Sequence, residues 1–158
     1  MSIKRRVMDL LAKRDHSEKE LQQKLARVKK WDNKKERLYS DEEITQVITW
    51  ARENRWLQEA YLSERWAETL NKRKKGIKYI NAYLGQKGLP AVSKNLDIEE
   101  DKAVDLLRKK LKTKSFQTAF NETGKIDRDI KLKLIRFLAS RGFDQETIQR
   151  AFKKLNEL

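Results

Sequence analysis

The sequence predicts an all-α protein built from tandem helical repeats. Three observations support this: the chain is 38% hydrophobic and 39% charged, it has one proline and five glycines in 158 residues, and its apolar residues recur at helical spacing. Folds made of strands and tight turns need more Pro and Gly residues than this. Helices with one buried stripe and a wide polar face suit such a balance of apolar and charged residues.

Capping residues place the helix boundaries in the first third of the chain. The first helix should end near Arg14–Asp15, and Ser17 and Glu20 have the S-x-x-E spacing of a capping box at the start of the second. The segment KKWDNKKERLYS breaks the apolar period and predicts a loop. Ser40 and Glu43 repeat the capping-box spacing, so a third helix should begin there.

Six more helices are expected in the rest of the chain. NKRKKG separates the fourth from the fifth, Gly88 ends the fifth, Pro90 can only begin a new, short helix, and the acidic segment LDIEED opens the seventh. TKSFQTAFNETGK predicts a second loop before the last two. This gives nine helices, of which all but the short one at Pro90 show an apolar stripe: Ile3-Val7-Leu10-Leu11, Leu21-Leu25-Val28, Ile44-Val47-Ile48-Ala51, Leu62-Trp66-Leu70, Ile77-Ile80-Leu84, Ala103-Leu106-Leu107-Leu111, Ile130-Leu134-Phe137-Leu138 and Ile148-Ala151-Phe152-Leu155.

One helix–turn–helix pattern occurs three times. LAKRDHSEKELQQKL aligns with LASRGFDQETIQRAF near the end of the chain, and its turn reappears in the middle as LGQKGLP. The only histidine, His16, aligns with Phe143 and Leu89, which indicates a packing position before a helix cap. A metal site usually needs three or four ligands, and the chain has no second His and no Cys. We therefore interpret His16 as a structural residue.

Three such units, each with an accessory helix, predict three tandem three-helix repeats in an elongated, curved array. The repeats are expected at residues 1–56, 57–96 and 97–158. Units this small must pack on their neighbours to bury their stripes. Trp31 and Tyr39, in the first loop, are the aromatic residues expected to be exposed, and five others should pack in the core: Trp50, Trp56, Trp66, Phe137 and Phe152.

The charge of the chain indicates the class of its partner. Lys and Arg total 38 against 24 Asp and Glu, a formal net charge of +14. This predicts binding to nucleic acid, an acidic protein surface or anionic lipid, and a soluble basic protein with a merely solvated surface is the alternative. No apolar run approaches the ~20 residues of a membrane span, and MSIKRRVMDLL lacks the apolar core of a secretory signal. We expect a soluble, cytoplasmic protein that binds no membrane.

Positive charge is concentrated in the middle and last repeats. Between Arg65 and Lys94 the only acid is Glu68. A second basic run lies from Lys102 to Ser115, where six basic residues accompany a single acid, Asp105. A solvated helical surface is the alternative interpretation. No P-loop, dinucleotide-binding, zinc-protease or nucleophile-elbow motif is present, so we expect no enzymatic activity, metal or cofactor. The candidate residues for binding a nucleic acid or a nucleoprotein filament are Lys72, Arg73, Lys74, Lys75, Lys78, Lys87, Arg108, Lys109 and Lys110.

Four segments in this order resemble the RecX family of bacterial regulators of RecA recombinase: LLAKRDHSEKELQQKL, VITWARENRWL, RKKGIKYINAYLGQKGL and RFLASRGFDQETIQRAF. The resemblance covers nearly the whole chain. It implies tandem three-helix repeats in a crescent. It also implies a protein that lies in the groove of the RecA–single-stranded DNA filament and inhibits recombinase and co-protease activity, by capping growth or promoting disassembly. We expect a monomer. From its charge we expect weak, non-specific binding to bare single- and double-stranded DNA.

The sequence departs from the family pattern at two places. The family usually has a Gly-Tyr-Leu-Asp-Asp type of turn after its third helix, whereas this chain has RWLQE at residues 55–59. Without that glycine, we expect Asn54 to adopt the left-handed conformation. The segment after Gly88 is also short, so the third helix of the middle repeat should be stunted.

Two other functions stay open from the sequence. One is a stand-alone basic helical protein that binds nucleic acid without RecA, and the other is an enzyme with a site that no motif reveals. The repeated stripe argues against a free recognition helix of the helix-turn-helix kind, because the second helix of each pair is needed in the stack.

Overall fold

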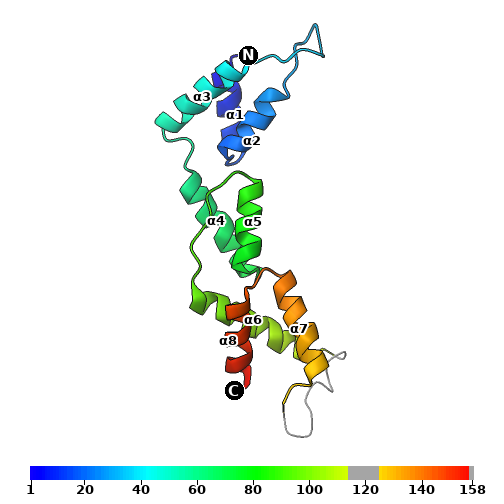
Figure 1. Ribbon diagram of the computed structural model, residues 1–158. Helices are drawn as coiled ribbons and strands as arrows, with labels where there is room; N and C mark the ends of the chain where they lie inside the picture. The colour runs from blue at the N-terminus through cyan, green and yellow to red at the C-terminus, as the bar shows by residue number, and fades with distance from the viewer. Residues whose placement is uncertain (114–124, 157–158) are drawn as a thin grey trace. The chain divides into compact units, whose positions relative to one another are not determined.

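The computed structural model describes residues 1–113 and 125–156, and these residues form eight α-helices and no β-strand (Figure 1). None of the helices described is long and apolar enough to cross a membrane. The all-α prediction is confirmed. The helices are α1 (Ile3–Lys13), α2 (Glu18–Ala26), α3 (Asp41–Glu53), α4 (Glu59–Lys72), α5 (Ile77–Gln86), α6 (Leu96–Leu111), α7 (Arg128–Ser140) and α8 (Gln145–Asn156).

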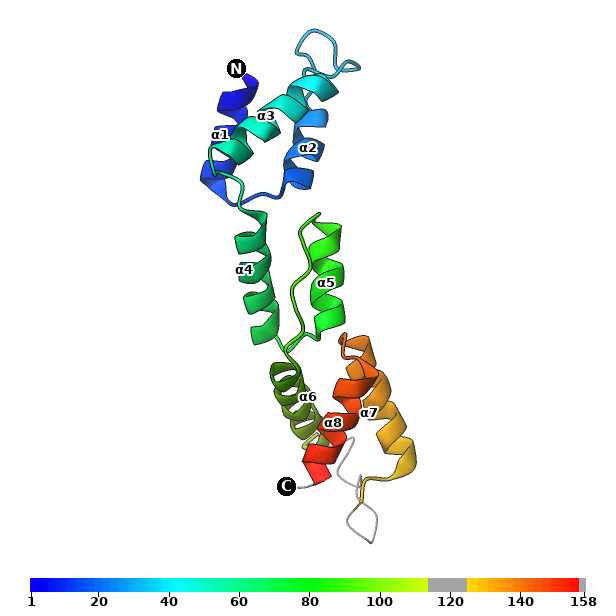
Figure 2. The same cartoon turned by 60° about the vertical axis from the view of Figure 1, so that its left-hand side comes forward.

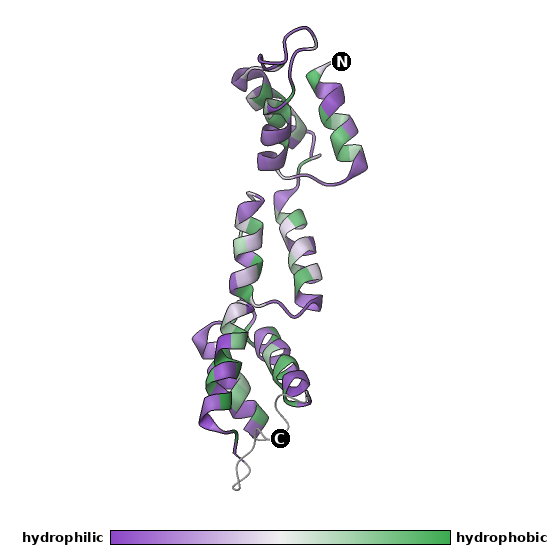
Figure 3. Cartoon of the chain, turned by 90° about the vertical axis from the view of Figure 1, so that its right-hand side faces the viewer, coloured by the Kyte–Doolittle hydropathy of each residue, from purple (hydrophilic) through white to green (hydrophobic). Residues whose placement is uncertain are grey.

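The chain divides into two compact units. Unit 1 comprises Met1–Arg65 and Leu84–Ala91, and unit 2 comprises Trp66–Tyr83 and the described part of Val92–Leu158. The division passes through α4 and α5, so each of these helices contributes one part to each unit. Within both units the helices carry apolar residues on one side and polar residues on the other (Figure 3).

Unit 1 is built around a cluster to which α1, α2 and α3 all contribute. α3 packs against both α1 and α2, as the second view shows (Figure 2). The 29–40 segment is a loop, as predicted, with one antiparallel bridge between Lys29 and Arg37. The buried members of the cluster are Val7, Leu21, Leu25, Tyr39, Ile44, Val47, Ile48, Ala51 and Leu57.

Unit 2 has its own apolar cluster, in which α8 packs on α6 and α7. The predicted stripes of these helices provide the cluster almost unchanged. Most of the second predicted loop, residues 114–124, lies outside the described residues. The buried members are Ala103, Val104, Leu107, Leu134, Leu138, Phe143, Ile148, Ala151 and Phe152.

The predicted short helix at Pro90 is wrong: between Gln86 and Leu96 the chain has a turn and then a segment without regular secondary structure. The Asn81 amide holds this segment open, since its Oδ1 accepts the Val92 N–H (2.9 Å) and its Nδ2 donates to the Val92 carbonyl (3.2 Å). Asn95 already caps α6, which leaves too few residues for another helix. Helical repeats are present, but the middle one has no third helix in the part described.

Helix starts follow the predicted caps with one difference. Ser40 and Glu43 form both halves of a capping box. Ser17 caps α2 by accepting the Glu20 N–H, but the Glu20 carboxylate does not return to the Ser17 backbone as a capping box requires. It pairs instead with Arg14 (2.8 Å) and Lys87 (3.4 Å), because two cations compete successfully with one backbone N–H.

Four helices end with a residue in the left-handed conformation: Arg55 (φ 59°), Lys74 (φ 59°), Gly88 (φ 73°) and Gly142 (φ 94°). The expectation for Asn54 is wrong, because its φ is −85° and the next residue takes the left-handed position. In each case the following N–H bonds back to the carbonyl five residues earlier, as in a Schellman motif. The turn chemistry of the repeat therefore recurs even where glycine is missing.

The three aligned turn positions are equivalent in the structure. His16, Leu89 and Phe143 are all buried, as the repeat predicted. The His16 Nδ1 lies 2.9 Å from the Arg14 carbonyl and its Nε2 lies 2.8 Å from the Lys24 ammonium. A carbonyl can only accept, so Nδ1 carries the proton and Nε2 accepts from Lys24. His16 is thus held as a neutral ring in a packed turn.

Candidate nucleic-acid interface

The basic loop that joins α4 to α5 holds the largest group of predicted contact residues. Lys72 is exposed and lies 3.4 Å from the Glu68 carboxylate, and Arg73 is exposed. Lys74 adopts positive φ and pairs with Asp105 on α6 at 3.0 Å. The sequence placed this loop correctly, and its sharp turn is made at Lys74, which takes the left-handed conformation although it is not glycine.

Gly76 has a different role, which is to allow close approach of two backbones. A Cβ at this position would lie 2.3 Å from the Gly142 carbonyl carbon and 2.5 Å from the Phe143 nitrogen. Gly76 donates its N–H to the Arg141 carbonyl (2.8 Å) and Lys78 donates its N–H to the Gly142 carbonyl (3.0 Å). The start of α5 therefore docks on the α7–α8 turn, and each end satisfies polar groups that the other helix leaves open.

A buried ion pair on α6 holds the backbone of the basic loop in place. Lys102 and Glu99 on α6 are 3% and 2% exposed and pair directly. Lys102 also donates to the Asn71 Oδ1 (2.7 Å) and to the Lys75 carbonyl (2.6 Å). The second Glu99 oxygen accepts the Ile77 N–H (2.9 Å). The end of α4, the loop and the start of α5 are thus fixed on α6 by hydrogen bonds to buried charges.

The second predicted group, Arg108, Lys109 and Lys110, lies in the last turn of α6. Arg108 and Lys109 are exposed, and the Lys110 ammonium lies 4.6 Å from the centroid of the Phe137 ring. Asp105, the partner of Lys74, is three and four residues before Arg108 and Lys109, so it shares their face of the helix. The structure therefore brings the basic loop to the helix face that carries the second group.

Lys87 is separate from the other candidates because it belongs to unit 1. Its ammonium lies 3.4 Å from the Glu20 carboxylate, and its carbonyl accepts a hydrogen bond from the Ser17 hydroxyl. The remaining eight predicted residues, from Lys72 to Lys110, all lie in unit 2. Within unit 1, Lys87 contributes to the junction of the α5 turn with α2.

Sequence reasoning missed a group of cations on α7. Arg128, Lys131, Lys133 and Arg136 are exposed along this helix. Acids at 127 and 129 interrupt this run in the sequence, which hid it from a search for dense basic segments. Counting charge by helix face would have found it.

Part of the predicted positive charge is neutralised within the fold. Lys102, counted in the second basic run, is buried against Glu99. The acidic start of α6 does more than favour a helix dipole, since Glu100 pairs with Arg150 at 2.8 Å and Asp101 with Lys154 at 3.1 Å, which ties α6 to α8.

The exposure of the aromatic residues differs from the prediction at two positions. Trp31 is almost fully exposed and Phe152 is buried, as expected. Tyr39 is buried instead of exposed, because it packs in the unit 1 cluster and its hydroxyl accepts from the Arg6 Nε (3.1 Å). Trp56 is half-exposed although it packs in a T-shaped arrangement with Trp50, with 4.8 Å between the ring centroids.

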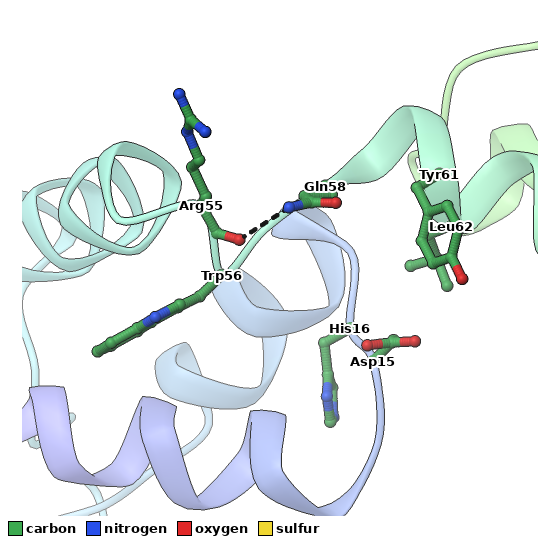
Figure 4. Close-up of a pocket in the computed structure, with 7 residues that line it drawn as sticks. All are labelled: Asp15, His16, Arg55, Trp56, Gln58, Tyr61 and Leu62. Atoms are coloured by element: carbon green, nitrogen blue, oxygen red, sulfur yellow. Dashed lines mark hydrogen bonds between the residues drawn. The ribbon is translucent and has the colours of Figure 1, made fainter.

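A cleft of about 190 Å³ lies in unit 1 where the α1–α2 turn faces the α3–α4 connection (Figure 4). The Gln58 amide donates to the Arg55 carbonyl at 3.2 Å and shapes that connection. The other lining residues are Asp15, His16, Trp56, Tyr61 and Leu62. Burial lowers the pKa of His16, assisted by the charges of Arg14 and Lys24, so this ring is neutral at pH 7.

No described residues form a group of three or more His, Cys, Asp or Glu side chains that could hold a metal ion. Asp144 is instead the cap of α8: it accepts the Thr147 N–H at 2.9 Å and pairs with Lys94 at 2.7 Å. Burial alone would raise the pKa of Asp144, but the hydrogen bonds from Lys94 and Thr147 lower it to about 2.

Comparison with known proteins decides the family. A model of the third three-helix domain of RecX matches residues 97–152. The regulatory protein RecX of Cronobacter sakazakii is 34% identical, over 94% of this chain and 88% of its own length. The chain belongs to the RecX family. The regulatory protein RecX of Neisseria meningitidis serogroup C is also similar, at 31% identity over 96% of this chain and 90% of that one.

Solved structures of RecX support the same fold. The crystal structure of RecX from Lactobacillus salivarius matches 99% of this chain and 96% of that chain with a TM-score of 0.79 at 16% identity. A second RecX crystal structure gives a TM-score of 0.69 over 99% of this chain and 70% of that one. The RecX-type repeat architecture predicted from the sequence is thereby confirmed. The relatives are named regulatory proteins, so membership of their family gives this chain a regulatory role.

Proposed function

We propose that this protein is a negative modulator of RecA recombinase. It binds in the groove of the RecA–single-stranded DNA filament and inhibits filament growth, ATP hydrolysis and co-protease activity. It acts in the cytoplasm as a monomer, without a cofactor and without catalysis of its own. Membership of the RecX family supports this proposal, because the family resemblance implies RecA as the target.

The observation that carries the proposal is that the basic loop presents exposed cations on a backbone fixed by buried hydrogen bonds. Lys72, Arg73 and Lys78 are exposed, yet the backbone beneath them is fixed by the buried Lys102 and Glu99. A merely solvated surface needs no such support. Cations on a rigid frame bind phosphate or carboxylate with a smaller loss of conformational entropy than cations on a flexible loop.

The test is RecA-dependent ATP hydrolysis on single-stranded DNA, titrated with the purified protein. Inhibition well below one protein per RecA is expected, because a few bound molecules that cap or disassemble a filament affect many RecA subunits. No inhibition at any ratio would contradict the proposal. DNA binding without inhibition would favour a stand-alone nucleic-acid-binding protein.

A further inference from the structure

Tyr79 is an exposed aromatic residue at the most basic part of unit 2. The residue is 38% exposed, and the Lys75 ammonium lies 4.7 Å from the centroid of its ring. A Cβ at Gly142 would lie 2.4 Å from the Tyr79 nitrogen and 2.5 Å from its Cβ, so only glycine lets the α7–α8 turn pack here. The backbone of Tyr79 is therefore packed closely against the α7–α8 turn. The start of α5 lies beside that turn in both views (Figures 1 and 2).

Arg141 supplies a second planar group at the same junction. Its carbonyl accepts the Gly76 N–H at 2.8 Å, and its guanidinium lies 5.1 Å from the centroid of the Phe137 ring. Lys110 also approaches this ring, at 4.6 Å. Phe137 is thus partly buried with two cations near its ring, whereas Tyr79 is exposed and has one.

We propose that Tyr79 is a stacking site for a base of single-stranded nucleic acid. Lys75, Lys78 and Arg141 bind the phosphates on either side. This inference rests on the proposed function, in which unit 2 binds a filament that contains single-stranded DNA. It adds that the basic part of unit 2 contacts this DNA strand.

The combination of groups favours a single strand over a duplex or an acidic protein. Phosphates and carboxylates both satisfy lysines, but a single strand also carries an unpaired base with a free π-face beside every phosphate, which suits a tyrosine flanked by cations. In a duplex the base faces are already stacked on each other. The lysine over the ring is no obstacle, because its long side chain can turn to a phosphate while the ring takes the base.

The test measures binding of the full chain to two fluorescent single strands of about 16 nucleotides, one of thymidines and one abasic. Both carry the same phosphates, and only one has bases. We expect the thymidine strand to bind at least about fivefold more tightly, which corresponds to roughly 1 kcal/mol of stacking. Tyr79→Ala should remove this difference, and Tyr79→Phe should keep it.

Tyr61→Ala is the matched control. Tyr61 is 57% exposed and has Arg65 over its ring at 5.8 Å, but it lies in unit 1. This variant should keep the preference for the thymidine strand. Equal affinity of the parent for both strands, or an unchanged preference in Tyr79→Ala, would overturn the inference and leave an acidic protein surface as the partner of these cations. RecA inhibition is measured separately, so failure of the proposed function would not be confused with failure of stacking.

Discussion

At the scale of single residues, the buried polar groups carry most of the information about this protein. His16 and Lys102 both look functional in the sequence, one as the only histidine and the other as part of a basic run. The structure gives both structural roles, His16 in the α1–α2 turn and Lys102 beneath the basic loop. Burial and hydrogen-bond partners distinguish these roles, and neither can be read from residue type alone.

His16→Phe should fold and retain RecA inhibition, since Phe143 fills the equivalent turn position. The wild-type stability should fall as the pH drops below 6.5, because the lowered pKa of His16 means that the unfolded chain takes up the proton first. The contribution of neutral His16 to the free energy of unfolding is fully present above pH 6.5. It is lost as the pH falls through the lower pKa of His16 in the folded state. Urea unfolding at pH 7.5 and 5.5 should show a smaller difference in the variant. A folded variant without inhibition would contradict the structural role.

Lys102→Met should destabilise unit 2 by about 3–5 kcal/mol, because it leaves the Glu99 carboxylate buried without its partner. The free energy of unfolding in urea measures this. Lys112→Met is the matched control, since Lys112 is exposed and its change should stay within about 0.5 kcal/mol. Equal stabilities of the two variants would mean that the buried pair does not support the loop.

At the scale of elements, the repeat packs the glycine turn that follows one helix closely against another helix. In unit 1 the Gly88 turn after α5 meets α2, where a Cβ on Gly88 would lie 2.6 Å from the Lys19 Cβ. In unit 2 the Gly142 turn after α7 meets the start of α5 in the same manner. The same close approach thus occurs once in each unit.

Gly76→Ala and Gly85→Ala should have opposite effects on stability. Gly76 touches the Gly142 backbone, so a methyl group there should cost about 1–3 kcal/mol. Gly85 lies within α5, and a Cβ there would have no neighbouring atom within 4 Å, so alanine should stabilise the helix by about 0.5–1 kcal/mol. Thermal unfolding compares them, and a harmless Gly76→Ala would show that the α5 junction is loose.

Sequence patterns predicted elements better than junctions. Apolar periodicity and capping residues placed all eight observed helices, because both signals are local. The helix expected at Pro90 was wrong because Asn81, which holds Val92 extended, lies eleven residues away. The left-handed turns at Arg55 and Lys74 were missed because neither residue is glycine. The basic loop was recognised from its charge, whereas the burial of Lys102 and the nearness of Tyr79 to Gly142 depend on tertiary packing.

At the scale of the whole molecule, the net charge of +14 sets the character of binding. Binding to bare DNA should be weak, non-specific and strongly dependent on salt, because each neutralised phosphate releases counterions. If the protein makes six to ten phosphate contacts, raising the salt from 50 to 200 mM should lower its affinity for DNA roughly 10³–10⁵-fold. Fluorescence anisotropy across that range measures the slope. An affinity independent of salt would indicate that the basic surface serves a protein partner only.

Binding of the RecA filament by the exposed cations of the basic loop and α5 in unit 2 is tested most directly by a charge-matched pair of variants. One variant changes Lys72, Arg73 and Lys78 to Ala, and the other changes the exposed Lys13, Lys34 and Lys35 of unit 1 to Ala. Both lose three positive charges. Lys74 is left in place because its ion pair with Asp105 ties the loop to α6, so its loss would change more than charge.

The measurement is the protein concentration that half-inhibits RecA ATP hydrolysis on single-stranded DNA at physiological salt. The unit 2 variant should need at least about tenfold more protein, a loss of ~1.4 kcal/mol of binding. The unit 1 variant should stay within about twofold of the parent. Equal inhibition by both variants and the parent would show that these unit 2 cations do not bind the filament.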